Sequence, residues 1–273
     1  MKTLFITDLD GTLLRNDKTI SAETCEILNR LILEGVAFSY ATARSVYSAS
    51  VLTRGINLCA PVITKNGTVI VNPADKSILH ENAFTEQEAK EIYQIIRKYN
   101  LDPIVASYQN GEEKFSYDCT NISAGTQSFL DDHPGDKREH PVEGEEHVLD
   151  GSVHYFTCIG TAAEMEGAYA DLKKKYRSLC AKDNYSDDVW LEVMPRFATK
   201  ADAIKQMQSL FGFEKVVVFG DGINDVSMFE IADECYAMEN AVPELKTIAT
   251  GIIGSNEEDG VARWLEENFH KYL

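Results

Sequence analysis

Leu4-Phe5-Ile6-Thr7-Asp8-Leu9-Asp10-Gly11-Thr12, close to the start of the chain, joins an apolar run directly to two carboxylates. The run predicts a short buried strand over residues 3–7. A charged group withdrawn from water must be paired, hydrogen-bonded or bound to a metal, so two carboxylates at the end of such a strand need partners. Taken alone, the stretch is explained equally well as an acidic turn between a strand and a helix. The rest of the chain decides whether these carboxylates form such a turn or a functional site.

Two further apolar runs in the first third of the chain end in polar loops. Ser21 is placed to cap a helix, and the run 36–41 that follows this helix stops at Thr42. The next run, 61–64, leads to Lys65-Asn66-Gly67. Strand, helix and strand at this spacing predict a right-handed βαβ unit in a parallel sheet. Ligands bind such sheets at the carboxyl ends of the strands, which is where these loops lie.

The last third of the chain resumes the same pattern. Thr199 and Asp202 have the spacing of a helix N-cap and its third helical residue. This puts Lys200 at the first helical position, beside N–H groups that attract anions. The most apolar run of the chain, 216–219, ends in Gly220-Asp221-Gly222-Ile223-Asn224-Asp225. Two more strand–helix steps are predicted after it.

Residues 84–190 have a different character. Two capping boxes, Thr85-Glu86-Gln87-Glu88 and Thr161-Ala162-Ala163-Glu164, open predicted helices there. Strand-like runs accompany them, but none ends in a carboxylate loop. We therefore predict an inserted α/β domain at 84–190, with the core formed by 1–83 and 191–273. The predicted fold class is α/β, with a Rossmann-like parallel sheet in the core.

The balance of charge argues against several classes of partner. The 273 residues include 26 basic and 44 acidic side chains, which gives a net charge of −18. This field repels nucleic acid and anionic membrane surfaces, so we expect neither as a partner. It also repels phosphorylated small molecules. A site for such an anion must therefore concentrate positive charge or hold a metal ion.

The cysteines and the apolar runs predict a soluble, cytoplasmic protein. The six cysteines are scattered with no CxxC pair, which favours reduced thiols over a disulfide framework. Met1-Lys2-Thr3 leads straight into the first predicted strand, so we expect no signal peptide. No apolar stretch reaches the roughly 18 residues that a membrane span requires.

Four histidines recur at intervals of seven residues, a spacing that resembles a metal-binding helical face. Two prolines and three glycines in this interval interrupt any such helix. We therefore interpret the spacing as coincidence. The four residues are His133, His140, His147 and His154.

The strand-end loops bring several kinds of polar group to one edge of the sheet. Each has a structural explanation by itself: Thr42 as a strand-end hydroxyl, Lys200 as a solvated helix start, Asp225 as the cap of a helix over 226–232. Three or four carboxylates at one edge would, however, repel one another unless a divalent cation lay among them. Ligand oxygens alone suit Mg²⁺ better than zinc.

A hydroxyl, a lysine and backbone N–H groups beside such a cation would form a cradle for phosphate. Asp8 or Asp10 could then attack phosphorus and form an aspartyl-phosphate, the intermediate typical of carboxylate nucleophiles. The residues themselves leave open which of the two carboxylates attacks.

These motifs resemble those of the haloacid dehalogenase superfamily and, within it, the Cof-like phosphatases with a type IIB cap. Asp8-Leu9-Asp10-Gly11-Thr12 resembles motif I, Thr42 motif II, Lys200 motif III and Gly220-Asp221-Gly222-Ile223-Asn224-Asp225 motif IV. The resemblance covers essentially the whole chain. Its motifs are specific in the core, whereas the inserted domain matches in topology only.

The resemblance implies a role for each residue of these motifs. Asp8 would be the nucleophile and a Mg²⁺ ligand, and Asp10 the general acid and base, with its backbone carbonyl on the metal. Asp221 would be a further ligand, and Asp225 would support the metal directly or through another residue. The transferred phosphoryl group would be held by three side chains: Thr42, Lys200 and Asn224.

The resemblance implies a small phosphorylated metabolite as substrate, such as a sugar phosphate or a nucleotide- or cofactor-like monophosphate. Specificity should come from the inserted domain, which acts as a cap in this family, and Tyr117 and Trp190 are candidate contacts there. In the core, Arg44 is a candidate substrate contact, with a structural ion pair as an equal alternative. No oligomeric state is predicted.

A phosphomutase is the nearest alternative, because it also forms an aspartyl-phosphate but returns the phosphoryl group to the bound substrate. A dehalogenase would not need an acid or base two residues after the nucleophile, so Asp10 argues against it. A catalytically idle binding or regulatory protein should have lost Asp8, Asp10 or Lys200, and none is lost. Ala201 and Cys235 stand where relatives often have glycine, and they leave the predicted reaction unchanged.

Overall fold

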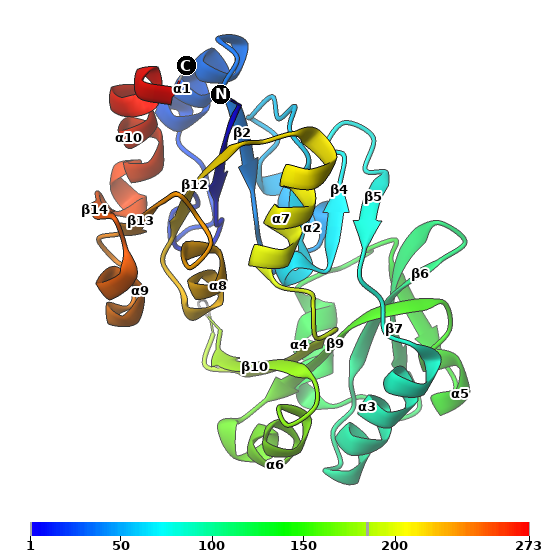
Figure 1. The fold of residues 1–273 in the computed structure, drawn as a ribbon. Coiled ribbons are helices and arrows are strands. Elements are labelled where there is room, and N and C mark those ends of the chain that lie inside the picture. Colours follow the sequence, from blue (N-terminus) through cyan, green and yellow to red (C-terminus); the bar gives the residue numbers. More distant parts are fainter. Residues whose placement is uncertain (1, 184–185, 273) are drawn as a thin grey trace. The chain divides into compact units, whose positions relative to one another are not determined.

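The computed structural model describes residues 2–183 and 186–272 (Figure 1). The chain forms two compact units, one of Met1–Glu81 with Thr199–Leu273 and the other of Asn82–Ala198. We call them the core unit and the inserted unit. Every residue of the four predicted motifs belongs to the core unit.

The core unit is built on a five-stranded parallel sheet. Its strands are β1 (Thr3–Thr7), β2 (Ala37–Tyr40), β12 (Lys215–Gly220), β13 (Glu234–Met238) and β14 (Gly251–Ile253). They lie in the order β14-β13-β12-β1-β2. The predicted N-terminal strand is thus confirmed, and its five residues are all buried, which explains its unbroken apolar run.

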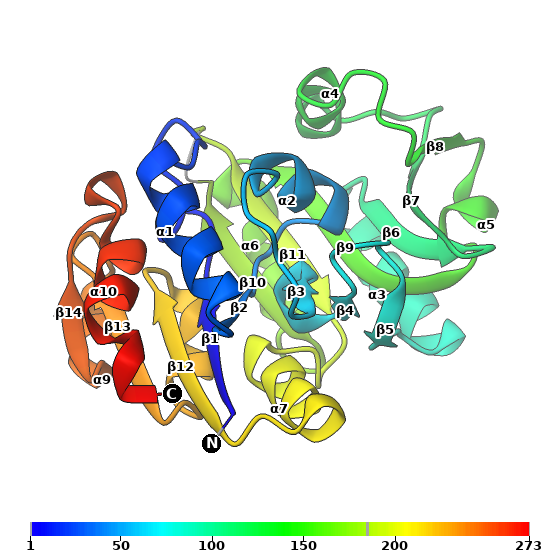
Figure 2. The same cartoon turned by 90° about the horizontal axis from the view of Figure 1, so that it is seen from above.

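Helices cover both faces of this sheet. They are α1 (Ala22–Leu33), α2 (Val46–Leu52), α7 (Lys200–Phe211), α8 (Val226–Phe229), α9 (Pro243–Ile248) and α10 (Gly260–Asn268). The connections β1-α1-β2 and β12-α8-β13 run outward in opposite directions, so right-handed crossovers place α1 and α8 on opposite faces. Helix α10 packs beside α1 (Figure 2), and α7 packs against α8. The strand order reverses between β1 and β12, the switch point at which such sheets bind ligands.

The third predicted strand of the parallel sheet makes only a short contact with it. β3 (Val62–Thr64) instead forms an antiparallel sheet with β4 (Val69–Val71) and β5 (Ile78–Glu81), and it meets the parallel sheet through an isolated bridge beside the end of β2. The run 61–64 is thus parallel to β2 as predicted, but it meets the end of β2 through a single bridge instead of a full ladder. The turn Lys65–Gly67, whose three residues all have positive φ, reverses the chain after β3 and so pairs β3 with β4.

The inserted unit contains a six-stranded mixed sheet in the order β10-β11-β9-β6-β7-β8. These strands are β6 (Ile104–Gln109), β7 (Glu112–Asp118), β8 (Glu139–Val142), β9 (Ser152–Gly160), β10 (Arg177–Lys182) and β11 (Val189–Met194). Its helices are α3 (Glu86–Lys98), α4 (Ala124–Asp131), α5 (Glu145–Val148) and α6 (Ala162–Leu172). Both predicted capping boxes are present, at the starts of α3 and α6.

Alternation along the strands divides the core of the inserted unit between two faces. Cys158 of β9 packs with α3 and α6, whereas the next residue, Ile159, packs with Phe129 of α4. The predicted α/β fold class, a parallel-sheet core with a separate α/β insertion, agrees with this architecture.

The inserted unit begins at Asn82, two residues before the predicted boundary, and the larger difference lies at the second boundary. A boundary at residue 191 cuts β11, which pairs with β10 on one side and β9 on the other. Residues 191–198 therefore belong to the inserted unit, and the chain returns to the core at Thr199. The sequence pattern misses this because a buried strand has the same apolar pattern in either unit.

The four evenly spaced histidines lie on separate elements. His133 follows α4, His140 lies in β8, His147 in α5 and His154 in β9. Within residues 2–183 and 186–272, no cluster of three or more metal-ligating side chains includes any of them. The four residues therefore do not share the face of one helix.

All six cysteines are free thiols. Among the described residues, none of the helices is both long enough and apolar enough to cross a membrane.

Candidate active site

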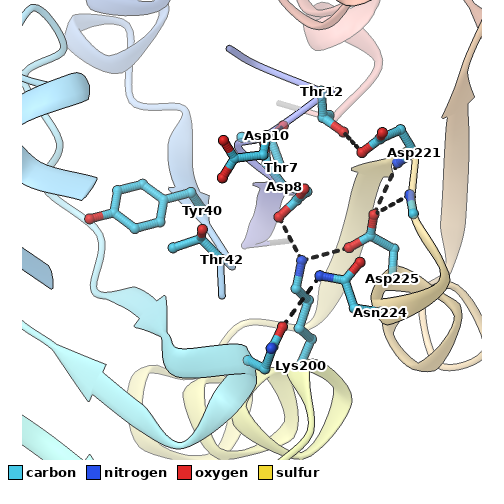
Figure 3. Close-up of polar contacts among 12 residues, drawn as sticks. Thr7, Asp8, Asp10, Thr12, Tyr40, Thr42, Lys200, Asp221, Asn224 and Asp225 are labelled. Atoms are coloured by element: carbon cyan, nitrogen blue, oxygen red, sulfur yellow. Dashed lines mark hydrogen bonds and ion pairs between the residues drawn. The ribbon is translucent and has the colours of Figure 1, made fainter. Parts of the chain in front are cut away.

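Three carboxylates from two adjacent strand ends meet at the switch point of the parallel sheet (Figure 3). Asp8 follows β1, Asp221 follows β12, and Asp225 ends the short 3-10 turn Ile223–Asp225. One oxygen from each carboxylate lies within 4.8 Å of the other two. A donor set made only of oxygen fits a hard divalent cation, so the residues present fit the metal expected from the sequence.

Lys200 lies buried among these carboxylates rather than in solvent. Its side chain has no exposed surface, and its Nζ donates to Asp8 Oδ1 and Asp225 Oδ1, each at 2.6 Å. The interpretation of Lys200 as a solvated helix start is therefore wrong. Burial lowers the pKa of Lys200, but its ion pairs with Asp225 and Asp8 outweigh burial and raise the pKa above the ordinary value.

One lysine does not balance three carboxylates. Burial and the charges of Asp225 and Asp221 raise the pKa of Asp8 well above its ordinary value, although Lys200 opposes this shift. Burial and the charge of Asp225 raise the pKa of Asp221 to about 7. The site thus carries excess negative charge that a bound cation would neutralise.

Asp225 shapes the loop that precedes it instead of capping the helix that follows. Its Oδ2 accepts hydrogen bonds from the backbone N–H groups of Asp221 and Gly222, both at 3.0 Å. No capping hydrogen bond joins its side chain to the described helix α8. The interpretation of Asp225 as a helix cap is wrong, and that helix ends at Phe229 rather than residue 232.

The side chain of Asp10 lies apart from the three-carboxylate cluster. Arg44 donates to both of its oxygens, from Nε to Oδ2 at 2.7 Å and from Nη2 to Oδ1 at 2.6 Å. Of the two explanations given for Arg44, the structure contains the ion pair. The metal contact predicted for Asp10 involves its backbone carbonyl, and it stays a prediction.

Thr42 and Asn224 are linked by the turn Lys65–Gly67, a strand-end loop whose side chains were given no role in the sequence prediction. Asn66 donates its backbone N–H to the Thr42 carbonyl at 2.9 Å, and its side-chain Oδ1 accepts from Asn224 Nδ2 at 3.3 Å. The buried Asn66 therefore links two of the predicted phosphate-binding residues. An Asn-Gly pair one residue after a strand was the available signal, because these residues favour positive φ.

Gly67 in the same turn lets the backbone approach the start of α7. A Cβ atom at this position would overlap with the Thr199 carbonyl, and φ of Gly67 is +100°. The turn thus packs directly against the residue that precedes Lys200. Thr12, quoted above only for its hydroxyl, donates to Asp221 Oδ1 at 2.9 Å.

The two aromatic candidates of the inserted unit both take part in its packing. Tyr117 donates its hydroxyl to Glu139 Oε1 at 2.6 Å, and Trp190 packs at an angle against Phe129. Both belong to one apolar cluster on the α4 face of the sheet. A contact of either residue with substrate stays a prediction.

The chain matches the family of haloacid dehalogenase-like hydrolases over residues 5–265. It belongs to this family. Two relatives from Bacillus subtilis are 5-amino-6-(5-phospho-D-ribitylamino)uracil phosphatases: YitU is 29% identical over 275 residues, 97% of each chain, and YwtE is 28% identical over 289 residues, 98% of each chain. The expected class of enzyme, a haloacid dehalogenase-type phosphatase, agrees with these relatives.

Solved structures of this hydrolase family have the same fold. A haloacid dehalogenase-like hydrolase from Bacteroides thetaiotaomicron superposes with a TM-score of 0.78 at 25% identity, covering 98% of this chain and 99% of that one. A subclass IIB sugar phosphatase of the superfamily superposes with a TM-score of 0.75 at 20% identity, over 98% of each chain. The fold expected from the motifs, including its inserted domain, is thus that of known haloacid dehalogenase-like hydrolases.

Proposed function

We propose that the protein is a Mg²⁺-dependent phosphatase that hydrolyses a small phosphorylated metabolite through an aspartyl-phosphate. The observation that carries this proposal is the buried contact of Lys200 with Asp8 and Asp225, beside the carboxylate of Asp221. A cation and a lysine at one sheet edge can neutralise the oxygens of a phosphoryl group, which is the largest requirement of phosphoryl transfer.

Asp8 is the proposed nucleophile. A carboxylate oxygen of Asp8 would form a bond to phosphorus while the bond from phosphorus to the leaving alcohol oxygen breaks. Water would then attack phosphorus of the aspartyl-phosphate, releasing inorganic phosphate and the free Asp8 carboxylate. Lys200 would remain beside the transferred group and stabilise its negative charge throughout.

Asp10 is the proposed general acid and base. It would give a proton to the leaving alcohol in the first step and take one from water in the second. The two hydrogen bonds from Arg44 hold its carboxylate in one orientation. Arg44 is also the core residue that we propose to contact the substrate, because it lies only two residues after Thr42.

The proposed metal ligands are Asp8, Asp221 and Asp225, together with the backbone carbonyl of Asp10. Mg²⁺, when bound, would supply positive charge at the phosphoryl oxygens. Thr42 and Asn224 would hold the remaining oxygens, and Asn66 would keep Asn224 in place through their hydrogen bond.

The names of the two Bacillus subtilis relatives indicate which substrates to test first. A phosphorylated compound with a ribityl chain and a pyrimidine ring falls within the nucleotide- or cofactor-like monophosphates expected from the sequence. We propose that the inserted unit acts as the cap that selects among such compounds. A cytoplasmic location, expected from the cysteine pattern, is part of the same proposal.

A screen of phosphorylated metabolites tests this function. We expect release of inorganic phosphate from sugar phosphates or nucleotide-like monophosphates, with kinetics on the best substrates to follow. A phosphomutase would instead convert one phosphorylated isomer into another without releasing phosphate. An idle binding protein would release none and form no isomer.

A further inference from the structure

The loop that follows the nucleophile is a tight turn whose backbone lies against a metal-site carboxylate. Leu9 accepts hydrogen bonds at its carbonyl from the N–H groups of Thr12, at 3.2 Å, and Leu14, at 2.8 Å. Gly11 has a φ of +78°, and a Cβ atom there would overlap with the carboxylate of Asp221. The next residue, Thr12, donates its hydroxyl to Asp221. The peptide between Gly11 and Thr12 therefore determines where Asp221 can lie.

Two asparagines from distant parts of the chain hold the carbonyls of this turn. Asn240 Nδ2 donates to the Gly11 carbonyl at 2.7 Å, and Asn256 Nδ2 donates to the Leu14 carbonyl at 3.0 Å. The two asparagines also bond to each other, since Asn240 Oδ1 accepts from the Asn256 backbone N–H at 3.2 Å. Both ends of the Asn240 amide are thus used, which fixes its orientation.

The residues that follow the turn are tied to the same C-terminal segment. Arg15 Nη2 donates to both carboxylate oxygens of Asp259, at 3.1 and 3.0 Å. The backbone N–H of Asn16 donates to Glu257 Oε1 at 2.7 Å. The C-terminal segment therefore holds the backbone on the far side of the turn as well, although these two contacts lie farther along the chain from Asp8.

We propose that Asn240 and Asn256 are positioning residues of the metal centre. By fixing the carbonyls of Gly11 and Leu14, they keep the hydroxyl of Thr12 directed at Asp221 and hold that carboxylate within reach of Asp8 and Asp225. Side chains that orient metal ligands without touching the metal have large effects on affinity. This inference rests on the proposed function, because it requires that the carboxylate cluster binds a divalent cation.

The chain offers a matched control in the same unit. Asn29 bridges two backbone groups in the same way, because its Nδ2 donates to the Gly55 carbonyl at 2.9 Å and its Oδ1 accepts from the Asn57 N–H at 2.7 Å. These partners follow α2 and include none of the motif residues. Asn29→Ala therefore removes an equivalent amide bridge at a place without predicted chemistry.

The test measures Mn²⁺ affinity by electron paramagnetic resonance or calorimetry in the full-length protein, without substrate. We expect Asn240→Ala and Asn256→Ala to weaken Mn²⁺ binding about tenfold. We expect Asn29→Ala to leave it unchanged, even where its melting temperature falls by the same amount. Hydrogen exchange of the Thr12 and Leu14 amides should become faster in Asn240→Ala and stay the same in Asn29→Ala.

The outcomes separate this inference from the proposed function. Mn²⁺ affinity in Asn240→Ala and Asn256→Ala equal to that of the unchanged protein overturns the positioning role, whatever the enzyme hydrolyses. Mn²⁺ binding that is weakened in these variants, in a protein that hydrolyses no phosphate ester, supports the positioning role and contradicts the proposed function. A protein that binds no Mn²⁺ at all contradicts both.

Discussion

Each unit buries a cation between two carboxylates, and the two groups differ in their balance of charge. In the inserted unit, Arg138 donates to Glu113 Oε2 at 3.2 Å and to both oxygens of Asp136, at 3.0 and 2.6 Å. In the core unit, Lys200 contacts Asp8 and Asp225. The core group has a third carboxylate, Asp221, close by.

The third carboxylate changes the direction in which the carboxylate pKa values are shifted. Burial raises the pKa of Asp136, but the hydrogen bonds and charge of Arg138 outweigh it, so the pKa lies below its ordinary value. The pKa values of Asp8 and Asp221 are raised instead. A buried ion pair that lowers the pKa of its carboxylate, as Arg138 does for Asp136, serves structure. A group whose surplus carboxylates raise one another's pKa is prepared for a further cation.

Replacing the proposed nucleophile should have the largest effect. Asp8→Asn keeps the shape of the side chain but removes the attacking oxygen charge, so we expect turnover to fall by a factor of about 10⁴ or more. The measurement is phosphate release on the best substrate, with circular dichroism to verify the fold. Glu113→Gln, its counterpart in the inserted unit, is the control and should retain Mn²⁺ affinity. Appreciable phosphatase activity in Asp8→Asn would refute the assignment of Asp8 as the nucleophile.

Replacing the proposed acid and base should have the next largest effect. Asp10→Asn should slow turnover by a factor of about 10² to 10⁴, because both proton transfers lose their donor or acceptor. The loss should be greatest on substrates with poor leaving groups, compared in a series of phosphate esters. An unchanged rate on a poor leaving group contradicts the acid role of Asp10.

Breaking the balanced group should affect stability rather than chemistry. Arg138→Met leaves two carboxylates without their buried partner, and we expect the free energy of unfolding to fall by about 3 kcal/mol. Chemical denaturation measures this change, and Mn²⁺ titration provides the contrast. If Arg138→Met weakens Mn²⁺ binding while stability is unchanged, the division of roles between the two groups is wrong.

A change of pH should have the smallest of these effects. The pKa of Asp221, about 7, is raised above its ordinary value. Without metal, the folded protein therefore retains this proton above pH 4, and the associated stability is lost as the pH rises through about 7. Since metal competes with this proton and with the one on Asp8, whose pKa is also raised, Mg²⁺ affinity should weaken at least about tenfold per pH unit below 7. Calorimetry between pH 5.5 and 8.5 measures the Mg²⁺ affinity. An affinity that does not change with pH contradicts the raised pKa of Asp221.

Much of the core could be predicted from sequence because its features are local. Apolar runs mark the strands, and strand ends carry Asp8, Thr42 and Asp221 to one edge whenever the strands are parallel. The positions of the motifs at the strand ends therefore predicted which side chains meet. The explanation of Lys200 as solvated failed because the direction of a side chain at a helix start depends on what packs against it.

Features that depend on contacts between distant segments were not predictable. The turn at Asn66 reverses the chain after β3. The hydrogen bond that Asn224 donates to Asn66 joins residues 158 positions apart, so only the folded chain shows it. The same holds for Asn240 and its bond to the Gly11 carbonyl. The boundary inside β11 failed for a related reason, because strand pairing assigns that strand to the inserted unit.

Metal removal tests the central claim most directly, since the surplus of carboxylates around Lys200 is explained by a divalent cation. Phosphate release should be measured on the best substrate before treatment with EDTA, after it, and again after Mg²⁺ is restored in excess. The account predicts that activity disappears with EDTA and returns with Mg²⁺. Activity that is indifferent to chelation would contradict it.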